Sequence, residues 1–555
     1  MPAPILLGES QFLSLRERGA LYVDKSGFVN EVLTAPAMVL LYPRPRRFGK
    51  TLNLTMLHAF FEIGPDRSWA FQDLSIWLDP QARAHFQKHP VVYLTFKDTK
   101  YETWVRARQT IQILLTDEIS RHREALTDPR VPPEVVRRLE RVLTGTARPS
   151  DEERSLRDLC VALHIHHGAQ PILLIDEYDS CVLHAWEKGY YDESVEFFRA
   201  LLSPALKDNP HLYKGVLTGI LRIAKESMFS GLNNVEVYSL LNQQRGEYFG
   251  FTEPEVFQLL DAFGRGGERA EVARWYNGYR FGRTTVYNPW SITRMLNRPG
   301  EPLTPHWLGT SDNALVRSLL LQNPDLGPQV ETLLRGGAVA ARIEENVPLR
   351  DLRGHHIWSL FLFSGYLRAE NVETRGTQTW ADLTIPNLEV GGIWRDTFTE
   401  WIGGSSGQVA PLHAALLGGN APKVEELLRG LLLRNASVHD SPETQDELFY
   451  HAFVLGLLVT MENTHAVRSN RESGEGRPDL LILPKRPGLP GVVLEFKRKR
   501  GKTPLATSAR AALKQIIDRN YAVEVEAAGA SVVRKFGIAF SGKEVVVRGE
   551  KVAPG

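Results

Sequence analysis

The chain has 555 residues, of which 43% are hydrophobic and 24% charged, and this size predicts roughly two to four globular domains. A net charge of +1 excludes nucleic-acid binding driven by the charge of the whole chain, so such binding needs local basic patches. Two cysteines exclude a disulfide framework and suit a reducing compartment. With no signal-peptide pattern and no apolar run of ~20 residues, we expect a cytoplasmic protein without a membrane partner.

The first half of the chain alternates short apolar runs with longer helical patterns. The apolar runs predict buried strands, and they lie at residues 38–43, 91–96, 171–176 and 213–220. Leu54, Leu57 and Phe61 recur at helical spacing, so residues 51–63 predict a helix directly after the first strand. Strands separated by helices predict a mostly parallel sheet.

A phosphate-binding pattern lies between the first strand and the first helix. Gly49 allows close backbone approach, Lys50 suits the β- and γ-phosphates, and the Thr51 hydroxyl suits Mg²⁺. The usual pattern has another glycine five residues before Gly49, where this chain has Arg44. The alternatives are therefore a nucleotide site with an unusual loop and a chance match in a basic turn.

A second motif favours the nucleotide site. The strand "PILLID" ends in Asp176, and Glu177 follows. In P-loop ATPases an acid at this place holds Mg²⁺, and the next acid orients or deprotonates the attacking water. An acidic strand end that faces solvent is the alternative. Arg46 and Arg47 add positive charge to the loop, and the order of the two motifs predicts ATP and Mg²⁺ as cofactors.

The fourth strand and the region after it are harder to interpret. In "VLTGILR", Thr218 could sense the γ-phosphate and Arg222 could contact it, or both could have structural roles. Residues from about 240 to 430 are less regular, and we expect them to be mainly helical.

A new pattern begins near residue 442. An amphipathic helix is expected at 444–458, three strands follow, then a helix at 508–521 and a further strand. This order of elements is typical of restriction-type nucleases.

Two of these strands carry the charged residues of such nucleases. Asp479 begins one strand, and Glu495 and Lys497, two residues apart, project to one face of the next. Two carboxylates that share Mg²⁺ or Mn²⁺ can polarise a phosphodiester, and a lysine stabilises the developing charge. Glu472 and Gln515 could complete the site. The alternative is a solvated face, but apolar residues flank Glu495 and Lys497.

Residues 485–502 are rich in lysine and arginine, which suits the phosphate backbone of DNA or RNA. Basic surface loops without a ligand are also frequent. Nucleic acid is therefore the expected partner.

Several long motifs resemble one bacterial family. They are "LYVDKSGFV", "YPRPRRFGKTLNLTML", "LLIDEYDS", "LTGILRIAKESMFSGLNN", "WYNGYRFGRTTVYNPWSI" and "SNRESGEGRPDLLIL…VVLEFKRKR…ALKQIIDRNYA". Together they resemble AAA-ATPase-like proteins fused to a C-terminal PD-(D/E)XK nuclease domain. That family tolerates a non-glycine residue where Arg44 stands.

The resemblance implies an α/β protein: a P-loop NTPase-type parallel sheet, a helical middle region and a restriction-endonuclease-like α/β domain. The expected boundaries are 1–238, 239–435 and 436–555. The implied nucleotide residues are Lys50, Thr51, Asp176 and Glu177. The implied nuclease residues are Asp479, Glu495 and Lys497, with Glu472 and Gln515 in support.

Three hypotheses about function follow. The first is an ATPase whose nucleotide state regulates a Mg²⁺-dependent nuclease. The second is a nucleotide-switched module that binds nucleic acid or a protein without cleavage. The third is a defence or signalling ATPase that oligomerises on a trigger, as an ATP-dependent homo-oligomer.

Overall fold

The structure is a computed structural model of the chain. It describes residues 3–223, 234–242, 246–307, 318–320, 323, 326–352, 354–401, 406–435, 454, 457–458, 461, 464–469, 478–498, 503–541 and 544–550. The chain forms two compact units: unit 1 is Met1–Trp307 with Ala340–Glu389, and unit 2 is Leu308–Val339 with Val390–Gly555. The expected module boundaries after residues 238 and 435 stay a prediction. Among the described residues, no helix combines the length and apolar character that a membrane crossing requires.

A five-stranded sheet forms the centre of the N-terminal part of unit 1. Its strand order is β2-β3-β4-β1-β6, and every neighbouring pair is parallel. The strands are β1 (Val39–Pro43), β2 (Val91–Thr95), β3 (Ile172–Asp176), β4 (Lys214–Gly219) and β6 (Val235–Val237). Because β1, β3 and β4 are buried along their whole length, their sequences are almost continuously apolar. The predicted parallel sheet is confirmed.

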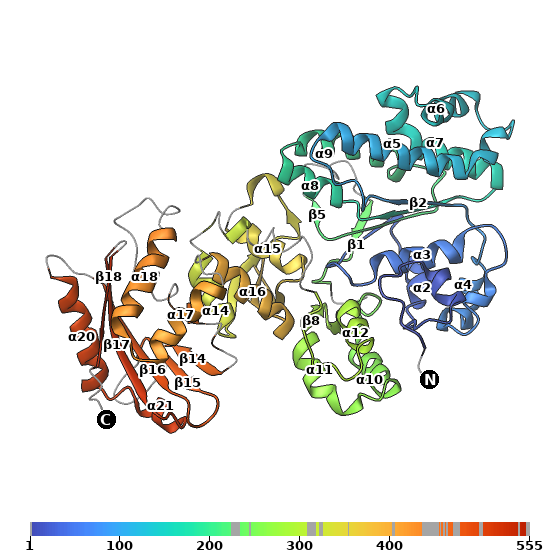
Figure 1. The fold of residues 1–555 in the computed structure, drawn as a ribbon. Helices are drawn as coiled ribbons and strands as arrows, with labels where there is room; N and C mark the ends of the chain where they lie inside the picture. Colours follow the sequence, from blue (N-terminus) through green and yellow to red (C-terminus); the bar gives the residue numbers. More distant parts are fainter. Residues whose placement is uncertain are drawn as a thin grey trace. The chain divides into compact units, whose positions relative to one another are not determined.

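Helices cover both faces of this sheet (Figure 1). One face carries α2 (Gly27–Thr34) and α3 (Lys50–Phe61), and the other carries α5 (Trp104–Arg121), α7 (Pro149–His167), α8 (Ser180–Lys188) and α9 (Tyr191–Leu206). The remaining helices of this part are α1 (Phe12–Glu17), α4 (Pro80–Arg83) and α6 (Pro133–Leu143). The predicted helix after the first strand is α3.

The carboxyl ends of the parallel strands meet at one edge of the sheet. Tyr42 of β1 lies opposite Thr218 of β4, and Thr95 of β2 lies opposite Asp176 of β3. Because β4 lies between β1 and β3, the loop after β1 and the acids after β3 flank the end of β4. In open α/β sheets this edge is where ligands bind.

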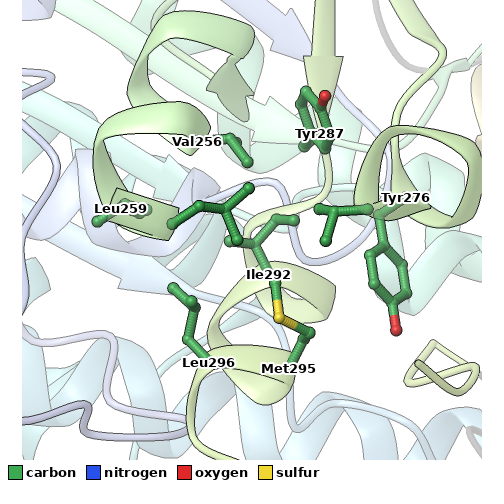
Figure 2. Close-up of a cluster of buried hydrophobic side chains, with 9 residues drawn as sticks. Val256, Leu259, Tyr276, Tyr287, Ile292, Met295 and Leu296 are labelled. Atoms are coloured by element: carbon green, nitrogen blue, oxygen red, sulfur yellow. The ribbon is translucent and has the colours of Figure 1, made fainter. Parts of the chain in front are cut away.

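The middle region contains helices and small antiparallel sheets. One sheet has the order β7-β9-β8, built from β7 (Phe251–Thr252), β8 (Tyr279–Phe281) and β9 (Thr284–Tyr287). Gly282, with a φ of 60°, begins the two-residue turn between β8 and β9, where glycine suits a type II′ turn. The helices are α10 (Glu253–Ala262), α11 (Arg269–Tyr276) and α12 (Pro289–Leu296). Figure 2 shows their shared core, in which Val256, Leu259, Tyr276, Ile292 and Met295 are buried.

A second group of elements follows in the chain. The sheet β10-β13-β12 consists of β10 (Val339–Ile343), β12 (Arg368–Arg375) and β13 (Gln378–Thr384). The short strands β5 (Arg222–Ile223) and β11 (Asn346–Val347) pair in parallel, and α15 is His355–Phe363. The middle region is thus helical as expected, with small sheets that the irregular sequence did not reveal.

Unit 2 is built on a mixed sheet with the order β14-β15-β16-β17-β18. The strands are β14 (His465–Ser469), β15 (Leu480–Pro484), β16 (Gly491–Arg498), β17 (Val533–Ser541) and β18 (Glu544–Gly549). Only β16 and β17 are parallel among the paired neighbours described. Helix α20 (Leu505–Asp518) covers one face, and α17 (Ser406–Leu417) and α18 (Ala421–Asn435) lie on the other (Figure 1).

The remaining helices are α14 (Gly327–Leu334), α21 (Val523–Ala527) and α16 (Leu388–Trp401), which runs from one unit into the other. The predicted order of three strands, a helix and a strand is confirmed, and β18 adds one strand that we had not expected. The helix expected at 444–458 lies outside the continuously described residues.

Candidate functional site

The loop between β1 and α3 joins the end of a buried strand to the first turn of a helix, which is the setting that a phosphate-binding loop requires. Gly49 has a φ of 80°, and a Cβ there would meet nothing within 4 Å, so the left-handed backbone rather than crowding favours glycine. Lys50 is buried, and its Nζ donates to the carbonyl oxygens of Arg44 and Pro45, both at 3.0 Å. Burial lowers the pKa of Lys50, against the opposing effect of nearby acids.

Arg44 replaces the usual glycine without projecting its side chain into the loop. Its Nη1 donates to the carbonyls of Pro43 at 2.8 Å and Tyr238 at 2.5 Å. The guanidinium lies 5.1 Å from the ring centroid of Phe249 and 5.3 Å from that of Phe281. Burial lowers the pKa of Arg44 to about 10, and the two rings offer cation–π contacts in place of water. The arginine is therefore part of the core beneath the loop.

Asp176 joins α3 to β4 through hydrogen bonds. Thr51 Oγ1 donates to Oδ2 and Thr218 Oγ1 donates to Oδ1, each at 2.6 Å. Asp176 is fully buried, and this burial raises its pKa although both hydroxyl bonds favour the carboxylate. Three of the predicted nucleotide residues therefore meet at the carboxyl edge of the sheet, next to Lys50.

The two acids after Asp176 differ in burial. Glu177 is half-buried and has a φ of 50°, a left-handed conformation that is uncommon outside glycine and clusters at functional sites. Asp179, which we did not single out from sequence, is buried, and its Oδ2 accepts the backbone N–H groups of Ile220 at 2.8 Å and Leu221 at 2.7 Å. Burial raises the pKa of Asp179 to about 6. It thus fixes the loop after Thr218.

The other predicted basic residues have different partners. Arg47 lies over the ring of Trp290 at 4.4 Å and donates to the His306 carbonyl at 3.4 Å. Arg222 pairs with Glu345 at 3.8 Å. Arg46 is half-buried, and its charge contributes to lowering the pKa of Lys50, after the larger effect of burial. The charge of Arg46 therefore acts on the loop lysine.

The second candidate site lies where β15 and β16 begin to pair. The backbone N–H of Asp479 donates to Glu495 Oε2 at 3.3 Å, and the N–H of Phe496 donates to Asp479 Oδ2 at 2.6 Å. Glu495 is buried and Asp479 is half-buried. The two carboxylates are therefore held side by side by the backbone of the neighbouring strand.

Helix α20 completes this cluster. Lys497 Nζ donates to Gln515 Oε1 at 2.7 Å, while Gln515 Nε2 donates to Glu495 Oε1. Gln515 thus connects the lysine to the acid, and its Nε2 also lies 3.4 Å from the hydroxyl of Tyr521. The structure brings together four of the residues proposed from the sequence: Asp479, Glu495, Lys497 and Gln515. Glu472 lies outside the described residues.

A glycine permits the close approach of α20. Gly537 on β17 pairs with Glu495, and a Cβ there would lie 2.2 Å from the Ala509 carbonyl oxygen and 2.3 Å from the Leu513 nitrogen. Any larger residue would push the helix that carries Gln515 away from the sheet.

Both clusters offer oxygen ligands. In the first, a threonine hydroxyl and an aspartate are joined by a hydrogen bond; in the second, an aspartate and a glutamate lie together. Oxygen donors of this kind suit Mg²⁺, which prefers carboxylates and water. Sequence reasoning missed Asp179 and Tyr521, although "LLIDEYDS" and "IIDRNYA" contain them.

Comparisons with known proteins identify the families that two regions of the chain match. Residues 6–229 match the family described as Predicted AAA-ATPase, and residues 445–550 match the PD-(D/E)XK nuclease superfamily. An uncharacterised protein from the 5′ region of vnfD in Azotobacter chroococcum is 25% identical over 553 residues, or 96% of each chain. A Walker-type ATPase of Pyrococcus abyssi is 13% identical, with a TM-score of 0.36, and the match covers 71% of this chain and 98% of that one. The two family matches confirm the resemblance stated from the motifs.

Proposed function

We propose that this chain, which joins an AAA-ATPase-like region to a PD-(D/E)XK nuclease-superfamily region, hydrolyses ATP and uses its nucleotide state to regulate metal-dependent cleavage of nucleic acid. The observation that carries the proposal is that each region has a lysine close to an acid that hydrogen bonds hold in place. Two threonines bond to Asp176 near Lys50, and Gln515 bonds to both Lys497 and Glu495. Both clusters use residue types that suit phosphate chemistry.

In the nucleotide site, this chain's residues bind and orient phosphate. Lys50 exchanges the carbonyls of Arg44 and Pro45 for phosphate oxygens, and the backbone N–H groups at the start of α3 face the same charge. Thr51 and Asp176 would hold Mg²⁺, which when bound neutralises phosphate charge. Glu177, half-buried beside Asp176, orients or deprotonates the attacking water.

Thr218 links this site to β4, the strand that lies between β1 and β3 in the sheet. Its hydroxyl is bound to Asp176, so a change in the hydrogen bonds of Asp176 on nucleotide binding acts on β4 directly. Asp179 holds the two residues after Gly219, so the same strand end is fixed from a second side.

In the nuclease site, Asp479 and Glu495 would hold Mg²⁺ or Mn²⁺, which when bound polarises the scissile phosphate and lowers the pKa of bound water. Lys497 stabilises the charge that develops on the phosphate. Gln515 sets the direction of the Lys497 ammonium and of the Glu495 carboxylate, since it is bonded to both. Gln515 is therefore a positioning residue. DNA or RNA is the proposed partner, and an ATP-dependent homo-oligomer stays a prediction.

The proposal is tested with purified full-length protein on single- and double-stranded DNA and RNA, with Mg²⁺ or Mn²⁺, with and without ATP. We expect ATP turnover in the wild type and its loss in Glu177→Gln, with nucleotide binding retained. Nucleic-acid binding without turnover or cleavage in the wild type would instead support a nucleotide-switched binding module.

A further inference from the structure

A compact group of two histidines and a glutamate lies in unit 1, outside both candidate sites. Glu344 follows β10, and His355 and His356 begin α15. His355 Nε2 lies 3.2 Å from Glu344 Oε1, and His356 Nε2 lies 3.0 Å from Glu344 Oε2. One oxygen of Glu344 and one nitrogen of each histidine all lie within 4.8 Å of one another. A single small ion can therefore reach all three side chains.

The surrounding backbone fixes these three residues. The N–H of Glu344 donates to Ser359 Oγ at 2.9 Å, and this hydroxyl donates to the His355 carbonyl at 3.1 Å. Ser359 is fully buried, so the strand end and the first turn of the helix are tied through the protein interior. The side chains of His355, Glu344 and His356 are 34%, 28% and 15% exposed, which leaves a route for an ion. Support of this kind preorganises metal ligands.

We propose that Glu344, His355 and His356 form a binding site for a transition metal of the Zn²⁺ class. Zn²⁺ favours ligand sets that include imidazole nitrogens, whereas Mg²⁺ favours ligand sets made only of oxygens. The two imidazoles and one carboxylate of this cluster therefore suit Zn²⁺ better than Mg²⁺. With three protein ligands the fourth tetrahedral position is open to water. Arg342 donates to Glu344 Oε1, and His356 Nε2 lies 3.0 Å from Oε2, so a metal at Oε2 would take the place of that histidine–carboxylate hydrogen bond. The site is separate from both proposed activities.

The site has a consequence for its neighbours. The next residue, Glu345, accepts a hydrogen bond from Ser239 Oγ at 2.7 Å and pairs with Arg222 at 3.8 Å. A metal that fixes Glu344 therefore also restrains the residue that holds Arg222, just after β4. This makes the turn between β10 and β11 a point at which metal occupancy can affect the nucleotide region.

A second cluster in the same unit provides a matched control. Glu124, His166 and His167 also bring their ligand atoms within 4.8 Å. However, Glu124 is exposed, and His166 Nδ1 is already bonded to Asp128 Oδ2 at 3.1 Å. Asp128 is paired in turn with Arg130 at 2.7 Å. We expect these histidines to stay in their present ion-pair network.

The experiment measures metal binding directly in full-length, chelator-treated protein without nucleotide. Equilibrium dialysis with Zn²⁺ in excess Mg²⁺ should show that the wild type binds Zn²⁺. The affinity for Zn²⁺ should fall at least about 10-fold in the double variant His355→Ala/His356→Ala. The affinity should persist in His166→Ala/His167→Ala and in Asp479→Ala. Co²⁺ in the same site should give the strong visible absorption of a tetrahedral complex, and Glu344→Gln should weaken it.

Thermal melts without metal show whether each variant is folded. If the wild type binds no Zn²⁺ in excess Mg²⁺, or if His355→Ala/His356→Ala binds it as the wild type does, the proposal is wrong. Loss of Zn²⁺ only in His166→Ala/His167→Ala would also overturn it and assign binding to the other cluster.

Discussion

The two candidate sites hold a lysine beside acids in different ways. In the nucleotide site, Lys50 donates to carbonyls of its own loop, while Asp176 on another strand is held by two threonines. In the nuclease site, Lys497 and Glu495 come from one strand, and the side chain of Gln515 connects them. A phosphate can replace loop carbonyls as the partner of Lys50. The lysine–acid geometry of the nuclease site is already set by a side chain on a packed helix.

Because of this difference, we expect mutations at the two sites to change different properties. Changes in the P-loop region should act first on nucleotide affinity and on the packing beneath the loop. Changes in the nuclease cluster should act first on the rate of cleavage. The following variants test this contrast, beginning with the largest expected effect.

Removing the acid that we propose as a metal ligand should have the largest effect. In Asp479→Ala we expect cleavage to fall on the order of 10³-fold, because a bound metal supplies several kcal/mol of transition-state stabilisation. ATP turnover should be unchanged because the two clusters share no residue. Initial rates of cleavage and phosphate release measured on the same preparation check both statements. A parallel loss of turnover would show that the sites are not independent.

Restoring the usual glycine in the loop should destabilise the protein. Arg44→Gly removes a buried side chain between Phe249 and Phe281 and its bond to the Tyr238 carbonyl. We expect a loss of about 2–4 kcal/mol in the free energy of unfolding. Nucleotide affinity should not improve, because this side chain lies in the core rather than in the loop. Denaturant unfolding and nucleotide titration test these two effects.

The matched control is Arg46→Gly, which removes a half-buried charge from the same loop. It should cost less stability than Arg44→Gly and should weaken nucleotide binding more. The reverse ranking for stability would contradict the structural role given to Arg44.

Cutting the link between lysine and acid should slow cleavage without preventing metal binding. Gln515→Ala removes the amide that bonds Lys497 and Glu495, and we expect kcat to fall about 10–100-fold. KM for nucleic acid should change little, because Gln515 acts through its neighbours. Steady-state kinetics separate these parameters. A change confined to KM would indicate that Gln515 contacts substrate.

We expect the smallest effect at Gly219, the last residue of β4, which lies between β1 and β3 in the sheet. In Gly219→Ala the new Cβ would lie 2.5 Å from Asp179 Oδ1 and 2.8 Å from the Tyr178 ring, so we expect a loss of about 1–3 kcal/mol in stability. Gly64→Ala is the control, since its Cβ would meet only Arg67 Nη2, at 3.9 Å. Thermal unfolding compares the two variants. Equal stability would mean that Asp179 does not constrain this turn.

Local sequence patterns were enough to predict the strands of the parallel sheet and the helix after the first strand, because the periodicity of each element involves residues close together in the chain. The position of the Arg44 side chain could not be predicted, because Phe249 and Phe281 reach it from more than 200 residues away. The pairing of Arg222 with Glu345 could not be predicted either, because these two residues are also far apart in the chain. Strands β7 and β8 have two and three residues, which is too short for a clear periodic signal, and β12 has eight residues but its sequence, RAENVETR, is mostly polar.

The most direct test of the central claim is a nuclease assay with Mg²⁺ that compares the wild type, Lys50→Ala and Asp479→Ala, each with and without ATP. The account predicts that ATP changes the cleavage rate of the wild type, that ATP has no effect on Lys50→Ala, and that Asp479→Ala cleaves on the order of 10³-fold more slowly than the wild type under both conditions. Equal cleavage by the wild type and Asp479→Ala would contradict it.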